Sequence, residues 1–294
     1  MRTAIGVYLL WSAPGLSVPM TVASLPDVTP SDTVVSVQRG DLLRIENFSG
    51  ELLIRSWDRS EVNVEFDDRR DSDIEVSRRA GRVEVRASPR KGRDRNHVYV
   101  VSVPAWLPVQ IRGAELDVRA EGLGARLEVT TRDGDISVRN HSGDVVARAL
   151  DGAIDVRRSS GSFELRSLDD DVSVFDIEGD LFIEANDGDI EMIGIDAGVV
   201  DAGTMDGDIY FSGVLQTGGD YQLTTHDGDI SFEVPPGAGA EFSVATYSGE
   251  FETELPIVLQ RLERGRDLNF EVGGGGAQVR LRAFDGAIRL LQGR

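Results

Sequence analysis

The sequence predicts an all-β protein, in the form of a parallel β-solenoid with about two strands in each coil of 18–21 residues. The main observation is a repeated unit of a small residue, glycine, a second small residue and two apolar residues separated by one other, as in DGDISV at 133–138. Its central residue recurs every nine positions, at 134, 143, 152, 161, 170, 179 and 188. Composition agrees, because the 294 residues include 33 glycines, only 6% are aromatic, and no apolar pattern of helical period follows the first 24 residues.

Each nine-residue unit predicts one strand and one turn. Ile136 and Val138 lie two positions apart, as do Ile154 and Val156, and this spacing places both side chains of a pair on one face of an extended strand. An Asp-Gly or Ser-Gly pair separates the strands. Glycine accepts a positive φ, and the short polar side chain of Asp or Ser can hydrogen-bond to its own backbone, so the pair is typical of a turn.

Two consecutive units are predicted to form one coil. The Asp-Gly-Asp form recurs at Gly134, Gly188, Gly207 and Gly228, whereas the alternate glycines follow Ser, Ser and Glu, so the similarity is stronger at 18 residues than at nine. The later steps lengthen to 19 and 21 residues, as loops inserted at one edge would do. We therefore expect one residue from each coil to stack in a buried ladder, formed by Ile136, Ile154, Val172, Ile190, Ile209 and Ile230. An antiparallel meander with Asp-Gly hairpin turns is the alternative.

Residues 1–24 are predicted to be a secretory signal peptide. Arg2 precedes an apolar run from Ala4 to Trp11, helix-breaking residues follow at Pro14 and Gly15, and small residues then fit a cleavage site. An uncleaved anchor is the alternative, although the apolar run is short for a bilayer. We therefore expect an exported protein that is periplasmic, at the cell surface or secreted, with no transmembrane segment after signal cleavage. The sequence has no cysteine, which excludes disulfides and thiolate metal sites.

Residues 32–113 are predicted to form an N-terminal β-rich cap, and residues 114–292 the solenoid repeat region. The cap has strand-like alternation with looser spacing, and Pro104 and Pro108, on either side of Trp106, interrupt the pattern before the regular array. A cap is expected because a solenoid must cover its first coil. At the other end, Gln278–Leu290 is expected to close the last coil or to pair with it.

Several short motifs, in a fixed order, carry a family resemblance. Besides the repeated SGD and DGD units, they are Ile45–Leu52, Trp57, Val103–Val109, Val272–Gly276 and Phe284–Leu290. In this respect the chain resembles the bacterial putative-adhesin family, a domain of unknown function, over roughly residues 32–292. The resemblance implies an exported β-solenoid with an adhesin-like role, and it supplies no catalytic residues.

Negative charge is concentrated in residues 167–260, which we call the acidic segment. It contains 22 Asp and Glu and no Lys or Arg, whereas the other residues sum to +2 and the whole chain to −20. Such a surface repels nucleic-acid phosphates and anionic membranes, so no nucleic-acid partner is expected. A merely solvated acidic face and a surface for cations or basic partners both remain open.

The repeat predicts two rows of aspartates along one edge. The first row is Asp133, Asp151, Asp169, Asp187, Asp206 and Asp227, and the second is Asp135, Asp171, Asp189, Asp208 and Asp229. Neighbours in a row would lie about 5 Å apart, so the rows are candidate sites for divalent cations, most plausibly Ca²⁺. In the alternative, these aspartates serve turn geometry and are solvated. Calcium-binding β-rolls are not indicated, because their loops need more glycines than the one in each unit here.

No catalytic constellation is predicted. Among the three histidines, His141 and His226 precede turns of opposite series, which places them on opposite edges of a two-strand coil and argues against a shared site. Ser142 beside His141 is better explained as a turn residue than as a nucleophile.

Two classes of function follow from these features. The first is a non-enzymatic exported scaffold or adhesin-like protein of the bacterial cell envelope, which presents its sheet surfaces to an envelope protein or a glycan and is compatible with a homo-oligomer. The second is a polysaccharide-active β-helix enzyme or a glycan-binding module. The first is favoured because the acidic segment lacks the basic groups that a polyuronate lyase would need.

Overall fold

A computed structural model describes residues 33–47, 49–66, 72–89, 98–256 and 268–293, and every regular element in these ranges is a β-strand. The predicted signal peptide, residues 1–24, lies outside the described residues. Within these ranges, no helix has the length and apolar character needed to cross a membrane. The predicted all-β class is therefore confirmed.

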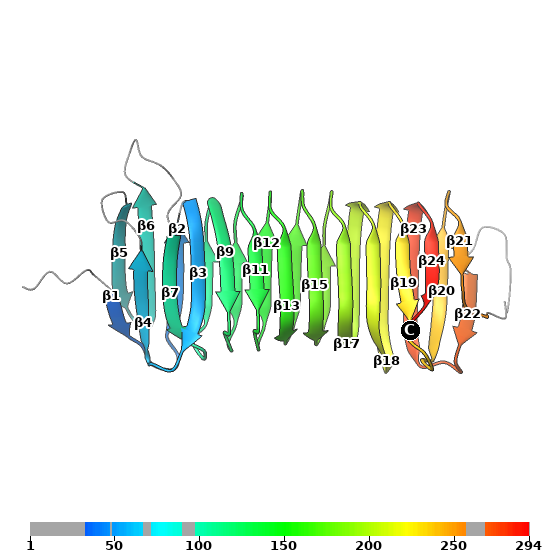
Figure 1. Ribbon diagram of the computed structural model, residues 1–294, viewed down its shortest axis with the longest axis horizontal. Helices are drawn as coiled ribbons and strands as arrows, with labels where there is room; N and C mark the ends of the chain where they lie inside the picture. Colours follow the sequence, from blue (N-terminus) through cyan, green and yellow to red (C-terminus); the bar gives the residue numbers. More distant parts are fainter. Residues whose placement is uncertain (1–32, 48, 67–71, 90–97, 257–267, 294) are drawn as a thin grey trace, which may run out of the picture. The chain divides into compact units, whose positions relative to one another are not determined.

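The strands form two series, and neighbours within each series pair in parallel (Figure 1). In spatial order the first series is β7 (Val98–Pro104), β3 (Ser49–Trp57), β9 (Glu115–Glu121), β11 (Ile136–Arg139), β13 (Ile154–Ser160), β15 (Val172–Glu178), the first parts of β17 (Ile190–Asp206) and β18 (Ile209–Asp227), β19 (Ile230–Val234), β24 (Ile288–Gln292) and β21 (Phe251–Thr253).

The second series runs alongside the first. Its members are β6 (Arg82–Pro89), β2 (Leu42–Asn47), β8 (Val109–Arg112), β10 (Leu127–Thr130), β12 (Val145–Ala149), β14 (Phe163–Ser167), β16 (Leu181–Glu184), the later parts of β17 and β18, β23 (Ala277–Asp285) and β20 (Ala240–Thr246). Because both series are parallel, the solenoid prediction is confirmed and the antiparallel meander is wrong for this array.

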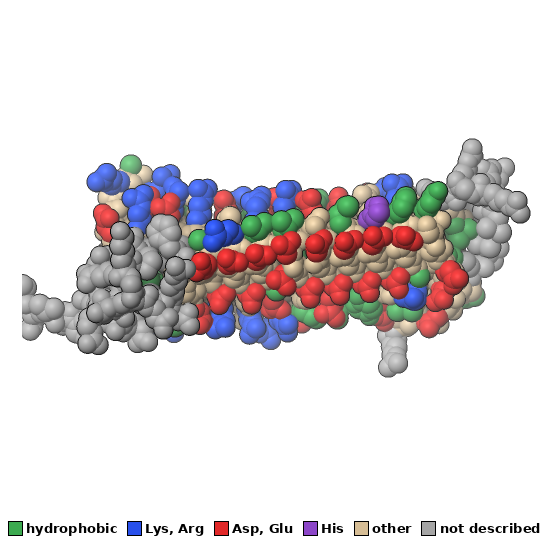
Figure 2. Space-filling view, turned by 90° about the horizontal axis from the view of Figure 1, so that it is seen from above, with side chains coloured by type: hydrophobic (Ala, Val, Ile, Leu, Met, Phe, Trp, Pro, Cys, Tyr) green, Lys and Arg blue, Asp and Glu red, His purple; other side chains and the backbone are tan. Residues whose placement is uncertain are grey.

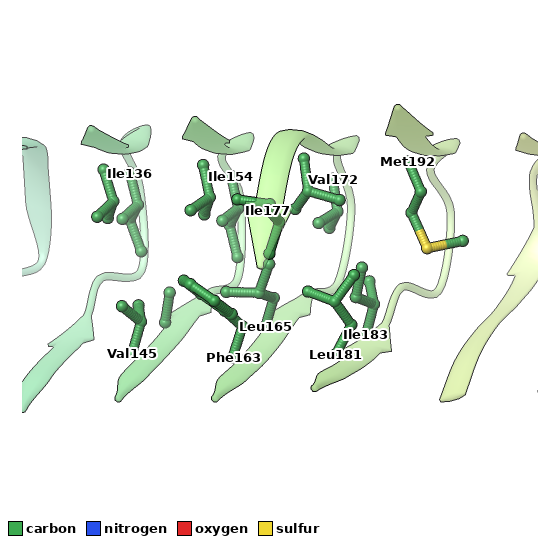
Figure 3. Close-up of a cluster of buried hydrophobic side chains, with 14 of the residues drawn as sticks. Ile136, Val145, Ile154, Phe163, Leu165, Val172, Ile177, Leu181, Ile183 and Met192 are labelled. Carbon is green, nitrogen blue, oxygen red and sulfur yellow. The ribbon is translucent and has the colours of Figure 1, made fainter. Parts of the chain in front are cut away.

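The core lies between the two series, where their inward side chains meet (Figure 3). Alternation places every second residue inside, as in β11, where Ile136 and Val138 are fully buried. Each member of the predicted ladder is at most 1% exposed. Each also pairs with its counterpart in the next coil, in the order Ile136, Ile154, Val172, Ile190, Ile209 and Ile230, and Ile288 continues the ladder.

Some turn glycines are required by the close approach of successive coils. Gly152 has a φ of 153° and Gly228 a φ of 155°, in the left-handed region that favours glycine. A Cβ atom on Gly152 would collide with the carbonyl oxygen of Gly134, and one on Gly228 with that of Gly207. The glycine at the centre of the repeat is thus both a turn residue and a contact between coils.

The order of strands in space departs from the order in sequence at both ends of the array. Strands β2 and β3 lie between β6–β7 on one side and β8–β9 on the other. Strands β23 and β24 lie between β18–β19 and β20–β21. Gln278–Leu290 therefore forms the penultimate layer. It pairs with the last layer, which is one of the two predicted outcomes, and does not close it.

The outer layers carry the antiparallel strands. At one end β4 (Glu61–Phe66) pairs with β7, β1 (Thr33–Ser36) pairs with β4, and β5 (Ser72–Arg79) pairs with β6. At the other end β22 (Leu268–Val272) pairs with β20. These strands cover the outermost parallel strands and pair their backbone groups. The predicted boundary near residue 113 stays a prediction, and parallel pairing extends across it from β9 to β3.

Replacing Ile190 with Asp should destabilise the protein by more than about 4 kcal/mol, because it puts an unpaired charge into the closed ladder. Ile190→Val, which keeps the shape and loses one methyl group, should cost about 1 kcal/mol. Equilibrium unfolding in urea measures both values. Similar stability of the two variants would show that position 190 is not enclosed.

Candidate functional site

One edge of the array has the same short pattern in successive coils. A small residue with a buried side chain is followed by an outward residue, a first-row aspartate, the turn glycine, a second-row aspartate and a buried ladder residue, as in Thr225–Ile230. The buried hydroxyl fixes this edge, since Thr225 donates a hydrogen bond to the carbonyl oxygen of Gly207 (2.9 Å) and Thr204 to that of Gly188 (3.0 Å). The turns are thereby held in the same conformation from coil to coil.

The two predicted aspartate rows occupy equivalent positions of this edge, and Figure 2 shows acidic side chains in two rows. In the first row Asp133 pairs with Asp151 and Asp206 with Asp227, and Asp285 extends the row. Asp169 and Asp187 hold the same position, because their N–H groups donate to the carbonyls of Leu150 (3.0 Å) and Leu168 (2.9 Å). Their side chains point into solvent, and that of Asp227 is 57% exposed.

The second row forms a ladder of side chain to backbone hydrogen bonds. The carboxylate of Asp171 accepts the N–H of Asp189 (2.8 Å), that of Asp189 accepts the N–H of Asp208 (2.8 Å), and that of Asp208 accepts the N–H of Asp229 (2.8 Å). Asp135 likewise accepts the N–H of Ala153 (3.0 Å), and Ala153 interrupts the row. The second-row aspartates therefore brace the turn of the next coil.

At the C-terminal end of the second row, Asp229 is bound more strongly. It accepts the N–H of Ala287 (2.7 Å) and an Arg289 Nη1–H (2.7 Å), and these bonds to the charged form lower its pKa. Arg289 comes from the inserted β24, and Arg280 of the inserted β23 pairs with Asp220 (2.8 Å). The inserted layer thus brings arginines into a region that is purely acidic in sequence.

The outward residue of the pattern forms a line of exposed apolar side chains beside the first aspartate row (Figure 2). We call this line the ribbon. Its apolar members are exposed by 41% to 80%, and in spatial order the ribbon is Leu150, Leu168, Asn186, Met205, His226, Phe284 and Tyr247. Five of the nine large apolar side chains that are exposed among the described residues belong to it.

Aromatic rings stack at one end of the ribbon. The ring centroids of His226 and Phe284 are 4.7 Å apart with an interplanar angle of 18°, and those of Phe284 and Tyr247 are 4.9 Å apart at 6°. Both faces of Phe284 are therefore covered, whereas Tyr247 remains 80% exposed. A groove of about 810 Å³ opens here, and its lining includes Met205, Tyr247 and Phe251. A second hollow of about 390 Å³ shares Met205 and continues over the outer side of β16.

The ribbon is a feature that the sequence analysis missed. The signal was available, because the residue two positions before the turn glycine, or before Asp170 in its place, is a large apolar or aromatic one at 150, 168, 205, 226, 284 and 247, with Arg132 and Asn186 as the exceptions. It was missed because these residues were considered one strand at a time, and because Phe284 and Tyr247 enter the line out of sequence order.

His141 lies at the opposite edge and is 2% exposed. It occupies the position that Leu123 holds one coil earlier, since the N–H of Ser142 donates to the carbonyl of Leu123 (2.8 Å). Burial lowers the pKa of His141 to about 4, so the ring is neutral at physiological pH. His226 is exposed on the ribbon, and the two histidines do not share a site, as the sequence predicts.

Divalent cation binding by the two aspartate rows stays a prediction. Within the described ranges no three acidic or histidine side chains converge as a metal site, and the second row already uses one oxygen of several carboxylates. If the rows bind Ca²⁺, millimolar calcium should raise the Tm more than NaCl of equal ionic strength, and Asp187→Asn with Asp206→Asn should reduce the difference. Equal shifts in the two salts would show simple screening.

Stability should fall as the pH decreases from about 6.5 to about 4, partly through His141. Its folded pKa is lower than its unfolded value, so its contribution is complete above pH 6.5 and is lost as the pH approaches 4. The loss is of the order of 3 kcal/mol for a shift of this size. His141→Leu should flatten this part of the urea-unfolding pH profile, whereas the control His226→Gln should not. An unchanged slope in His141→Leu would assign the acid sensitivity to other groups.

Comparison with known proteins places this architecture in a family. The model of the family described as Toastrack DUF4097 matches residues 24–291. A crystal structure of a "putative cell adhesion protein" from Clostridium sporogenes ATCC 15579 is 12% identical, with a TM-score of 0.25 and coverage of 90% of this chain and 100% of that chain. A "putative adhesin" from Bacteroides fragilis NCTC 9343 is 12% identical, with a TM-score of 0.45 and coverage of 89% and 99%. No curated protein matches the chain. Because the family model covers most of its length, the chain belongs to the Toastrack DUF4097 family.

Proposed function

We propose that this protein is a non-enzymatic, exported, adhesin-like scaffold of the bacterial cell envelope that presents the ribbon and its acidic borders to a partner. The observation that carries the proposal is the ribbon, which keeps exposed apolar side chains at one position of successive coils. Folding does not need these side chains outside, and contiguous exposed apolar surface is typical of interaction sites.

The repeat suits a scaffold because it multiplies one surface position along the array. The same register that buries the ladder also holds the ribbon and both aspartate rows in line. Two strands in each coil, a cap over residues 32–113, a repeat region over residues 114–292 and a signal peptide at residues 1–24 are parts of this proposal. Together, these parts describe an exported protein whose ribbon forms one straight edge of a rigid array.

A glycan-binding module or a polysaccharide-active enzyme is the second candidate, and the groove beside Tyr247 favours it. Sugars stack on free aromatic faces, however, and both faces of Phe284 are covered by its neighbours, so that Tyr247 is the exposed ring of this stack. Catalysis on a glycan would also need two carboxylates in a set geometry across a cleft. The carboxylates of the edge instead run in rows that point to solvent or brace turns. A protein partner therefore fits the surface better.

Fractionation of the native bacterium, followed by a sedimentation assay, tests the scaffold. We expect the tagged protein in the periplasmic or surface fraction, shortened by removal of residues 1–24. The purified protein should cosediment with envelope fragments, and Met205→Ser with Tyr247→Ser should reduce this binding at least fivefold. Val214→Ser is the control, because Val214 is 53% exposed on β18 but lies outside the ribbon. Cytoplasmic retention, or equal binding by all variants, would contradict the proposal.

A further inference from the structure

We infer that the partner of the ribbon is a cationic amphipathic α-helix of another protein, lying along the edge with its apolar side on the ribbon. This inference rests on the proposed scaffold function and names the partner class for the same surface. Three properties of the edge support it: its apolar centre, the acidic rows along one side, and the spacing between ribbon residues of successive coils.

The ribbon runs along seven successive coils, and five of its seven members are apolar. Leu150 and Leu168 are each 41% exposed, Met205 is 51% exposed, and Phe284 is 48% exposed. The groove of about 810 Å³ lies at the aromatic end and can accept one large apolar side chain of a partner. Asn186 and His226 are the polar members of the series, and Asn186 separates the two leucines from this end.

One side of the ribbon is acidic. On this side runs the first aspartate row, with the second row beyond it. On the other side the charges are mixed, because the hollow that shares Met205 is lined by Glu164, Glu184 and Asp201 and also by Arg166, which pairs with both glutamates (3.5 Å). A partner with Lys or Arg on the flank of its apolar stripe that faces the aspartate rows meets opposite charge there, whereas these rows repel an anionic membrane or nucleic acid.

The spacing between ribbon residues of successive coils favours a helical partner over an extended segment. Parallel strands lie about 4.8 Å apart, and a helix presents one side chain per turn on a given face about every 5.4 Å. An extended chain presents same-face side chains about every 6.7 Å, which differs more from the spacing of the coils. Six steps from Leu150 to Tyr247 span about 29 Å, the length of a helix of about 19 residues.

Fluorescence anisotropy with labelled synthetic peptides and the purified protein tests the inference. The probe is a 20-residue Leu/Lys peptide whose leucines form one helical stripe. We expect micromolar affinity that weakens at least tenfold in Leu168→Ser with Met205→Ser, and that also weakens between 50 and 300 mM NaCl. Val214→Ser, outside the ribbon, should bind as the parent does. Circular dichroism should show that the ribbon variant is folded.

Three control peptides decide between the outcomes. A scrambled Leu/Lys peptide without a stripe, a Leu/Glu peptide with the same stripe and a proline-containing cationic peptide should each bind at least tenfold more weakly. Equal binding of the scrambled or the proline-containing peptide, or undiminished binding by the ribbon variant, would overturn the inference. If no peptide binds but the protein still cosediments with envelope fragments through the ribbon, the partner class is wrong and the scaffold function stands. Loss of both results would overturn both proposals.

Discussion

The rest of the structure depends on the parallel register between coils. Each backbone bonds to the residue one coil away, so that Ile136 meets Ile154 and Asp206 meets Asp227. A side chain placed at one position is therefore repeated at about 4.8 Å along the array. Equivalent residues of successive coils therefore stack in columns along the array. Apolar residues become the buried ladder, second-row aspartates become a chain of turn braces, and outward apolar residues become the ribbon.

Such repetition has a cost at the ends, where a column stops and backbone groups have no partner. Near each end, one layer lies out of sequence order between two other layers. Strands β2–β3 and β23–β24, distant in sequence from their spatial neighbours, are both enclosed between other coils. The layers left outside are paired with antiparallel strands or, as with β21, are only three residues long. A short edge strand such as β21 offers few backbone groups for pairing with other chains.

The features that the repeat encodes locally could be predicted from the sequence. The nine-residue step, the strand alternation and the buried ladder from Ile136 to Ile230 follow from nearest-neighbour rules, and the structure bears them out. Insertion of Ala277–Gln292 as a penultimate layer could not be predicted in this way, because it is decided by pairing between segments up to 58 residues apart, such as Ile230 with Ile288. The aromatic end of the ribbon depends on the same insertion. Phe284 joins His226 to Tyr247 only because β23 lies between β18 and β20.

The inserted layer also changes the electrostatics of the edge. Without it the acidic segment would carry 22 negative charges with no internal compensation. With it, Arg280 and Arg289 pair with Asp220 and Asp229, and the backbone N–H of Ala287 together with Arg289 lowers the pKa of Asp229. The compensation is local to the last coils, so the first aspartate row along the middle of the array keeps its charge. The arginines of the inserted layer therefore reduce the repulsion among carboxylates at one end of the edge. Along the rest of the edge, the first aspartate row can still attract a cationic helix.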